Sequence, residues 1–187
     1  ALLLLMALLP VGASMAQDSA LVARAQAGEA EAQTELGYVY AVGEGVEQDF
    51  AEAIRWFQTA TRQGYADAQY NYGNMFANGF GVEQDFAEAL NWFRLAASQN
   101  HMRAQYNLGF MYDNGQGVSQ DYTEAARWYH AAAELGHAAA QNNLGVIYKY
   151  GYGVEQDYAE SLKWLQLSGE QEYPTGQFNL GAMYSNA

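Results

Sequence analysis

The 187-residue chain contains no cysteine, which excludes disulfides, thiol catalysis and cysteine metal sites. Packing alone must therefore hold the fold. Lysine and arginine are also scarce, eight against 21 acidic residues, and the formal net charge is −13 at pH 7. Such a surface repels phosphate backbones and anionic lipid headgroups, so we expect neither nucleic acid nor a membrane surface as a partner. The charge favours solubility, with attraction of basic partners as the sharper interpretation.

The N-terminal ALLLLMALLPVGASMA differs from the rest of the chain, because it carries no charge and is dominated by apolar residues. The apolar run is short for a bilayer-spanning helix and is followed by Pro10, Gly12 and small residues. This pattern is typical of a secretory signal peptide over residues 1–16, incomplete at its N-terminus, with cleavage before Gln17. We expect a periplasmic or secreted bacterial protein without membrane insertion after cleavage. An uncleaved membrane anchor is the alternative.

A phrase of nine residues recurs at an interval of 36. GVEQDFAEA occupies residues 45–53 and 81–89, and GVSQDYTEA and GVEQDYAES follow at 117–125 and 153–161. Aligned at this interval without a gap, the chain superposes columns of glycine, tryptophan and aspartate. These columns are Gly37, Gly73, Gly109, Gly145 and Gly181; Trp56, Trp92, Trp128 and Trp164; Asp49, Asp85, Asp121 and Asp157. A fixed period of this length indicates an array of repeated structural units.

Each copy reads as a helix, a glycine turn and a second helix. In residues 66–78, Ala68, Tyr72, Met75 and Phe76 share one helical face. Gly73 lies within that helix, where glycine costs about 1 kcal/mol relative to alanine, so we expect a neighbouring helix to approach it closely. The helix is expected to end at the turn over residues 79–81, whose two glycines permit a positive φ.

The repeated phrase starts the second helix. Asp85 is suited to the N-cap, and Glu88 is expected to complete a capping box. Ala89, Trp92, Phe93 and Ala96 follow at the spacing of a buried stripe, so we expect the four tryptophans to line one continuous interior. Copies are expected to end at Gly64, Asn100 and Gly136.

A single hairpin of this kind cannot fold alone. It buries three or four large side chains, at roughly 1.5–3 kcal/mol each, whereas ordering some thirty residues costs more. The hairpins must therefore stack, which predicts an all-α fold and specifically an α-solenoid.

Residues 104–136, AQYNLGFMYDNGQGVSQDYTEAARWYHAAAELG, resemble a Sel1-like repeat, a relative of the tetratricopeptide repeats. The resemblance implies a right-handed solenoid of stacked helix-turn-helix repeats. We expect this solenoid to consist of a degenerate capping helix over 17–29, repeats over 30–65, 66–101, 102–137 and 138–173, and a partial fifth repeat over 174–187. At the junction between the fourth repeat and the partial fifth, Glu172 replaces the usual glycine, and we expect Pro174 to start the next helix.

No catalytic, cofactor-binding or metal site is expected. The histidines, His101, His130 and His137, lack metal-ligand spacing, and His101 and His137 share one turn column, which favours a surface role. The glycine turns lie between two helices, unlike phosphate-binding loops, which follow strands.

The resemblance places the first helix of each hairpin on a concave face. The binding candidates on that face are Tyr38, Tyr70, Asn71, Asn74, Tyr106, Asn107, Phe110 and Asn143. Asn71, Asn107, Asn143 and Asn179 recur every 36 residues, and such amides can pin an extended peptide while aromatic rings pack its side chains. Alternatively, these amides hydrogen-bond the backbone of the next repeat.

We therefore expect a non-enzymatic exported scaffold or adaptor for a protein or peptide partner. Two alternatives stay open. One is a hydrolase of cell-wall or β-lactam substrates, as suggested for some exported relatives, and the other is a structural spacer without a specific ligand. The missing cysteines and the lack of a nucleophile–base pair argue against the hydrolase.

Overall fold

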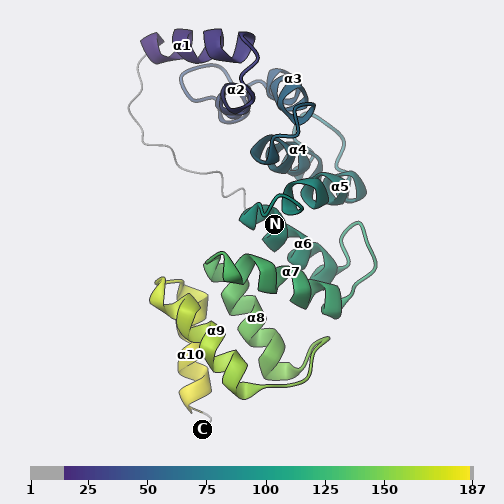
Figure 1. Ribbon diagram of the computed structural model, residues 1–187, viewed down its shortest axis with the longest axis vertical. Coiled ribbons are helices and arrows are strands. Elements are labelled where there is room, and N and C mark those ends of the chain that lie inside the picture. The colour runs from purple at the N-terminus through teal and green to yellow at the C-terminus, as the bar shows by residue number, and fades with distance from the viewer. Residues whose placement is uncertain (1–14, 186–187) are drawn as a thin grey trace. The chain divides into compact units, whose positions relative to one another are not determined.

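The computed structural model describes residues 15–185, which form ten α-helices and no strand (Figure 1). Residues 1–14, most of the predicted signal peptide, lie outside the described residues. In chain order the helices are α1 (Met15–Gln26), α2 (Ala30–Val42), α3 (Phe50–Thr61), α4 (Ala66–Asn78), α5 (Phe86–Ala97), α6 (Met102–Asn114), α7 (Tyr122–Glu134), α8 (Ala138–Tyr150), α9 (Tyr158–Glu170) and α10 (Pro174–Ser185).

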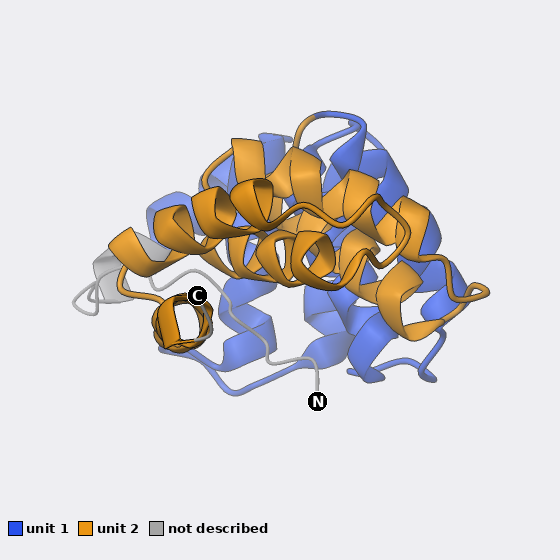
Figure 2. Ribbon diagram, turned by 90° about the horizontal axis from the view of Figure 1, so that it is seen from below, with its two compact units in different colours: residues 1–99 blue, residues 100–187 orange. Residues whose placement is uncertain are grey.

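The helices divide between two compact units, residues 1–99 and 100–187 (Figure 2). Unit 1 holds the hairpins α2/α3 and α4/α5, with α1 packed on α2 and α3 packed on α4. Unit 2 holds the hairpins α6/α7 and α8/α9, with α7 packed on α8 and α10 packed on both α8 and α9. Within each unit, consecutive hairpins therefore stack as predicted, and the all-α class is confirmed.

The first helix of each hairpin ends at a glycine, as the sequence predicts. α4 covers residues 66–78, and Gly79 follows in the left-handed region at φ 71°, its N–H bonded to the Met75 carbonyl. The glutamine of the repeated phrase then satisfies another carbonyl at this helix end, because Gln84 Nε2 donates to Ala77 O at 2.8 Å. Gln48, Gln120 and Gln156 make the equivalent bond.

The second glycine of the turn is required by close packing between repeats. A Cβ at Gly81 would lie 2.6 Å from the Cβ of Phe50, the first residue of α3. Phe80, between the two turn glycines, stacks on Phe50 with ring centroids 5.2 Å apart. The turn of one repeat thus rests on the start of the second helix of the preceding repeat.

The aspartate of the repeated phrase is the N-cap of each second helix, as predicted. Asp85 Oδ1 accepts from the Glu88 N–H at 2.9 Å, and Asp49, Asp121 and Asp157 do the same at their helices. The second half of the predicted capping box is wrong. The Asp85 N–H donates to Phe76 O on the first helix of the hairpin, at 3.0 Å, so no donor is left for Glu88. The cap therefore also ties the two helices of a hairpin together.

The predicted tryptophan interior is only partly right. Trp164 is buried, but Trp56, Trp92 and Trp128 are only partly buried. The residue after each tryptophan is fully buried instead, and these residues are Phe57, Phe93, Tyr129 and Leu165. The glycine within each first helix explains this, because it leaves room for the ring of the residue after the tryptophan to pack against the helix. A Cβ at Gly73 would lie 2.8 Å from the Phe93 ring. The rest of the stripe, Ala89, Phe93 and Ala96, is buried as predicted.

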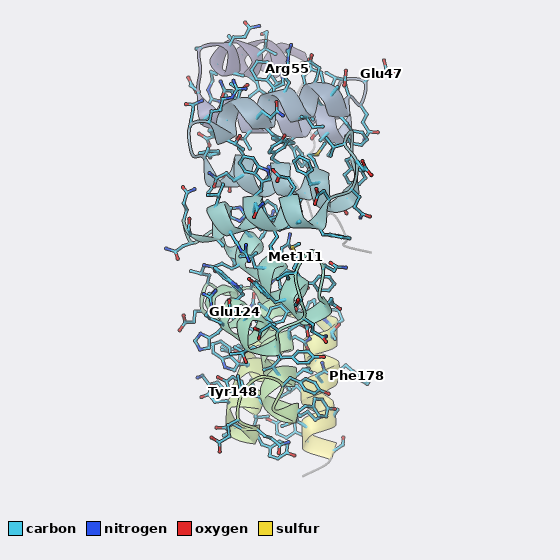
Figure 3. All side chains as sticks on the ribbon, turned by 90° about the vertical axis from the view of Figure 1, so that its right-hand side faces the viewer. Glu47, Arg55, Met111, Glu124, Tyr148 and Phe178 are labelled. Carbon is cyan, nitrogen blue, oxygen red and sulfur yellow. The ribbon has the colours of Figure 1, made fainter. Side chains whose placement is uncertain are left out.

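The junctions between repeats fall at the predicted residues and adopt a left-handed backbone. φ is 77° at Gly64, 61° at Asn100 and 91° at Gly136, and Glu172 takes 58° although it carries a side chain. Helix α10 begins at Pro174, as expected. On α10, Phe178 is 74% exposed and projects from the helix (Figure 3), and a Cβ added at Gly181 would meet no other described element within 4 Å.

A candidate binding surface on the first helices

The predicted binding residues all lie on the first helices of the hairpins, α2 and α4 in unit 1 and α6 and α8 in unit 2. In unit 1, Tyr38, Tyr70 and Asn71 are partly buried, and the ring of Tyr70 lies 5.9 Å from that of Phe93. Asn74 is only 7% exposed. Tyr38, Tyr70 and Asn71 therefore present the larger part of the predicted surface in this unit.

In unit 2, Tyr106, Phe110 and Asn143 are partly buried, whereas Asn107 is only 6% exposed. The amides also bond to one another, since Asn179 Nδ2 donates to Asn142 Oδ1 at 2.7 Å and Asn142 Nδ2 donates to Asn143 Oδ1 at 3.1 Å. The asparagine columns are thus partly committed to contacts within the unit, and the aromatic residues carry more of the accessible surface.

A polar network lies between α6, α7 and α8. The hydroxyl of Tyr129 on α7 donates to Asp113 Oδ2 on α6 at 3.3 Å. The ring of Tyr106, also on α6, lies 5.8 Å from that of Tyr129. Tyr129 is fully buried and Asp113 half-buried, so a carboxylate is held at the edge of the unit 2 core.

Burial dominates the electrostatics of this network. It raises the pKa of Asp113, an effect that the hydrogen bond from Tyr129 opposes. It also raises the pKa of Tyr106, helped by the charge of Tyr173 and opposed by a hydrogen bond from Asn143. Burial likewise raises the pKa of Tyr129, so both hydroxyls stay protonated and available as donors.

His137 borders the network and is more than the surface turn residue that was predicted. Its ring stacks on Tyr106, with centroids 4.4 Å apart and an interplanar angle of 14°. Its Nδ1 accepts from the Ala140 N–H at 3.3 Å, so it is the N-cap of α8. Burial, with a contribution from the charge of Arg103, lowers its pKa to about 4, and the imidazole is neutral at pH 7.

Sequence reasoning missed Asp113 and Tyr129. The sequence does contain a signal for them, because both residues differ from those at the equivalent positions of the other repeats. The column of Asp113 otherwise holds Ala41, Ala77 and Lys149, and that of Tyr129 holds Phe57, Phe93 and Leu165. A new carboxylate and a new hydroxyl appear in the same copy, and the structure shows them bonded.

Residues 15–185 offer no group of three or more histidine, aspartate or glutamate side chains able to hold a metal ion. Over the same residues, no helix has both the length and the apolar character needed to cross a membrane.

The model of the Sel1 repeat family matches residues 30–65, 66–101, 103–137 and 138–173. No match is found among curated proteins. Among solved structures, a protective antigen of uropathogenic Escherichia coli strains that displays an SLR fold is 40% identical, with a TM-score of 0.85 over 89% of this chain. A Sel1 repeat protein of Oxalobacter formigenes is 34% identical, with a TM-score of 0.80 over 85% of this chain.

This chain spans 36% of the length of the Escherichia coli antigen and 63% of the Oxalobacter protein. Cysteine-rich protein B of Helicobacter pylori shares the fold at 19% identity, with a TM-score of 0.54 over 67% of this chain and 90% of that one. The predicted class of stacked helical repeats is therefore confirmed by solved structures.

Proposed function

The chain belongs to the Sel1 repeat family, and we propose that it is an exported, non-enzymatic scaffold that binds a protein or peptide partner on its first helices. Sel1 repeats typically mediate protein–protein interaction, and within each unit the stacked hairpins support the first helices. In each unit the proposed surface is the exposed side of the first helices, which are α2 and α4 in unit 1 and α6 and α8 in unit 2. We call it the first-helix face.

The observation that carries the proposal is the placing of large aromatic side chains on this face. Tyr38, Tyr70, Tyr106 and Phe110 are partly buried, while the packing between helices is completed by Ala68, Met75 and other fully buried residues. Rigid aromatic rings that are partly accessible are the usual anchors of protein interfaces, because they bury much area at little entropic cost.

Export is supported by the sequence and by one relative. The predicted signal peptide over residues 1–16 is the sequence evidence. The Escherichia coli relative is described as a protective antigen. At 40% identity, this supports a periplasmic or secreted location for the present protein.

A photo-crosslinking experiment tests the proposal. The photoreactive amino acid p-benzoylphenylalanine is placed at Phe110 on α6 or, as the control, at Leu95, an exposed residue of the second helix α5. Both variants are irradiated in bacterial envelope extract. We expect a discrete adduct from position 110 and none from position 95. Equal adducts from both positions, or none from either, would contradict binding on the first-helix face.

A further inference from the structure

Asp113 is a half-buried carboxylate without a cationic partner in the described structure. Among the described residues, its side chain accepts a hydrogen bond from Tyr129 at 3.3 Å. Within residues 15–185, no lysine, arginine or histidine nitrogen lies within 4.0 Å of its oxygens. Arg103 is on the same helix but ten residues earlier, which is roughly 15 Å along the axis. A carboxylate removed from water without a countercharge lowers the stability of the fold.

The fold does not need this carboxylate. The same column holds Ala41 and Ala77 in unit 1, where both are buried. The facing column of the second helix holds Phe57 and Phe93, which fill the same space without a hydroxyl. Asp113 and Tyr129 therefore replace an apolar pair that packs well elsewhere in the chain.

The hydroxyl of Tyr129 orients the carboxylate through a long hydrogen bond of 3.3 Å. The Tyr129 side chain is fully buried, and its O–H donates to Asp113 Oδ2. Since that bond uses one of roughly four acceptor positions on the carboxylate, the others stay open to a further donor. Tyr106 precedes Asp113 by seven residues on α6, and Phe110 precedes it by three, so all three share one side of the helix.

We propose that Asp113 anchors an arginine or lysine side chain of the partner polypeptide, with Tyr106 and Phe110 packing the aliphatic stem of that side chain. This assignment rests on the proposed function and names the partner chemistry of the same face. The incoming cation would supply the countercharge that the described structure lacks, and a charge-assisted bond to a preformed carboxylate is stronger than one between neutral groups. The net charge of −13 favours encounter with a basic segment.

A phage-displayed library of random peptides, selected on the immobilised full chain, tests this assignment. The peptides selected are synthesised, and their Kd is measured for the wild type and for Asp113→Asn. The control is Glu47→Gln, which makes the same change in net charge at an exposed turn residue (Figure 3). A second variant, Tyr129→Phe, keeps the buried ring and removes only the hydroxyl that orients Asp113.

We expect the selected peptides to share a basic residue, and Asp113→Asn to weaken their binding about tenfold or more. Tyr129→Phe should weaken binding by less, and Glu47→Gln by less than about twofold. Peptides that bind the wild type and Asp113→Asn equally would overturn the assignment of Asp113 and leave the proposed function standing. A failure to select any peptide would count against both.

Discussion

The side-chain amide of Gln99 donates a hydrogen bond of 2.9 Å to the side-chain oxygen of Gln69, joining the end of one helical hairpin to its beginning. The same amide donates to Gly64 O, at the end of the preceding repeat. Gln63 bonds Gln33 and Gln171 bonds Gln141 in the same way, at 2.8 Å. In the third repeat the donor position is Leu135, and the buried Oε1 of Gln105 has no partner.

Leu135→Gln should therefore stabilise the protein. Leu135 is 48% exposed, so its replacement leaves no cavity, and the new amide can satisfy Gln105. We expect the free energy of unfolding to rise by about 1 kcal/mol. Urea denaturation followed by circular dichroism measures it, with Leu95→Gln as the control at another exposed leucine. Equal effects of the two substitutions would contradict the role given to Gln105.

Glu88 and Glu124 occupy equivalent positions in two repeats but bond different partners. Trp92 Nε1 donates to Glu88 Oε1 at 2.8 Å, whereas Glu124 pairs with Arg127 at 2.7 Å and the buried Trp128 Nε1 has no partner. We expect Glu88→Ala to destabilise the protein by about 1 kcal/mol more than Glu124→Ala, because only the first substitution removes the hydrogen-bond acceptor of an indole N–H. Thermal and urea unfolding of the two variants measure the difference, and equal losses would contradict it.

The helical glycines offer a matched pair of substitutions. A Cβ at Gly73 would lie 2.8 Å from the Phe93 ring, but a Cβ at Gly181 would meet nothing within 4 Å. Gly73→Ala should cost about 1–3 kcal/mol through overpacking. Gly181→Ala should gain up to about 1 kcal/mol from helix propensity. Calorimetric Tm values that move in the same direction for both variants would refute the close packing assigned to Gly73.

His137 should make stability depend on pH. Its pKa is lowered to about 4, so the folded state binds a proton less readily than the unfolded chain, whose histidines titrate near 6.5. The free energy of unfolding is unaffected by the titration of His137 above about pH 6.5, and this titration lowers it by at most about 3 kcal/mol as the pH drops to about 4. His137→Asn keeps an N-cap acceptor without titrating. Urea midpoints measured from pH 7 to 4 should fall less for this variant than for the wild type, and parallel curves would contradict the prediction.

The sequence predicts the fold well where one residue type has one structural purpose. Helix α4, the turn glycines, the N-cap aspartates and the junction at Asn100 all follow from local backbone chemistry and were predicted correctly. The errors concern the choice between partners. Glu88 bonds the Trp92 indole because the Asp85 N–H already donates to Phe76 O on the other helix of the hairpin. The position of Phe76 O is set by the packing of the two helices and not by local sequence.

The same distinction applies to the candidate site. Helical periodicity places Tyr70 and Phe110 on the first helices, but it does not show that Asn74 and Asn107 are buried. Asp113 and Tyr129 belong to different helices, and only packing brings the hydroxyl to the carboxylate. Their joint departure from the repeat was visible in the sequence, although the bond between them was not.

The most direct test of the binding site is the pKa of Asp113, followed through its carboxyl carbon by NMR as the pH is changed. We predict a value above the roughly 3.9 of aspartate in unfolded peptides, because burial raises the pKa of Asp113. Tyr129→Phe should raise it further, since the hydrogen bond that lowers it is lost, and a bound basic peptide should reduce it. A pKa at or below about 3.9 in the free protein would show that Asp113 is already solvated or paired, and would contradict its role as an open anchor.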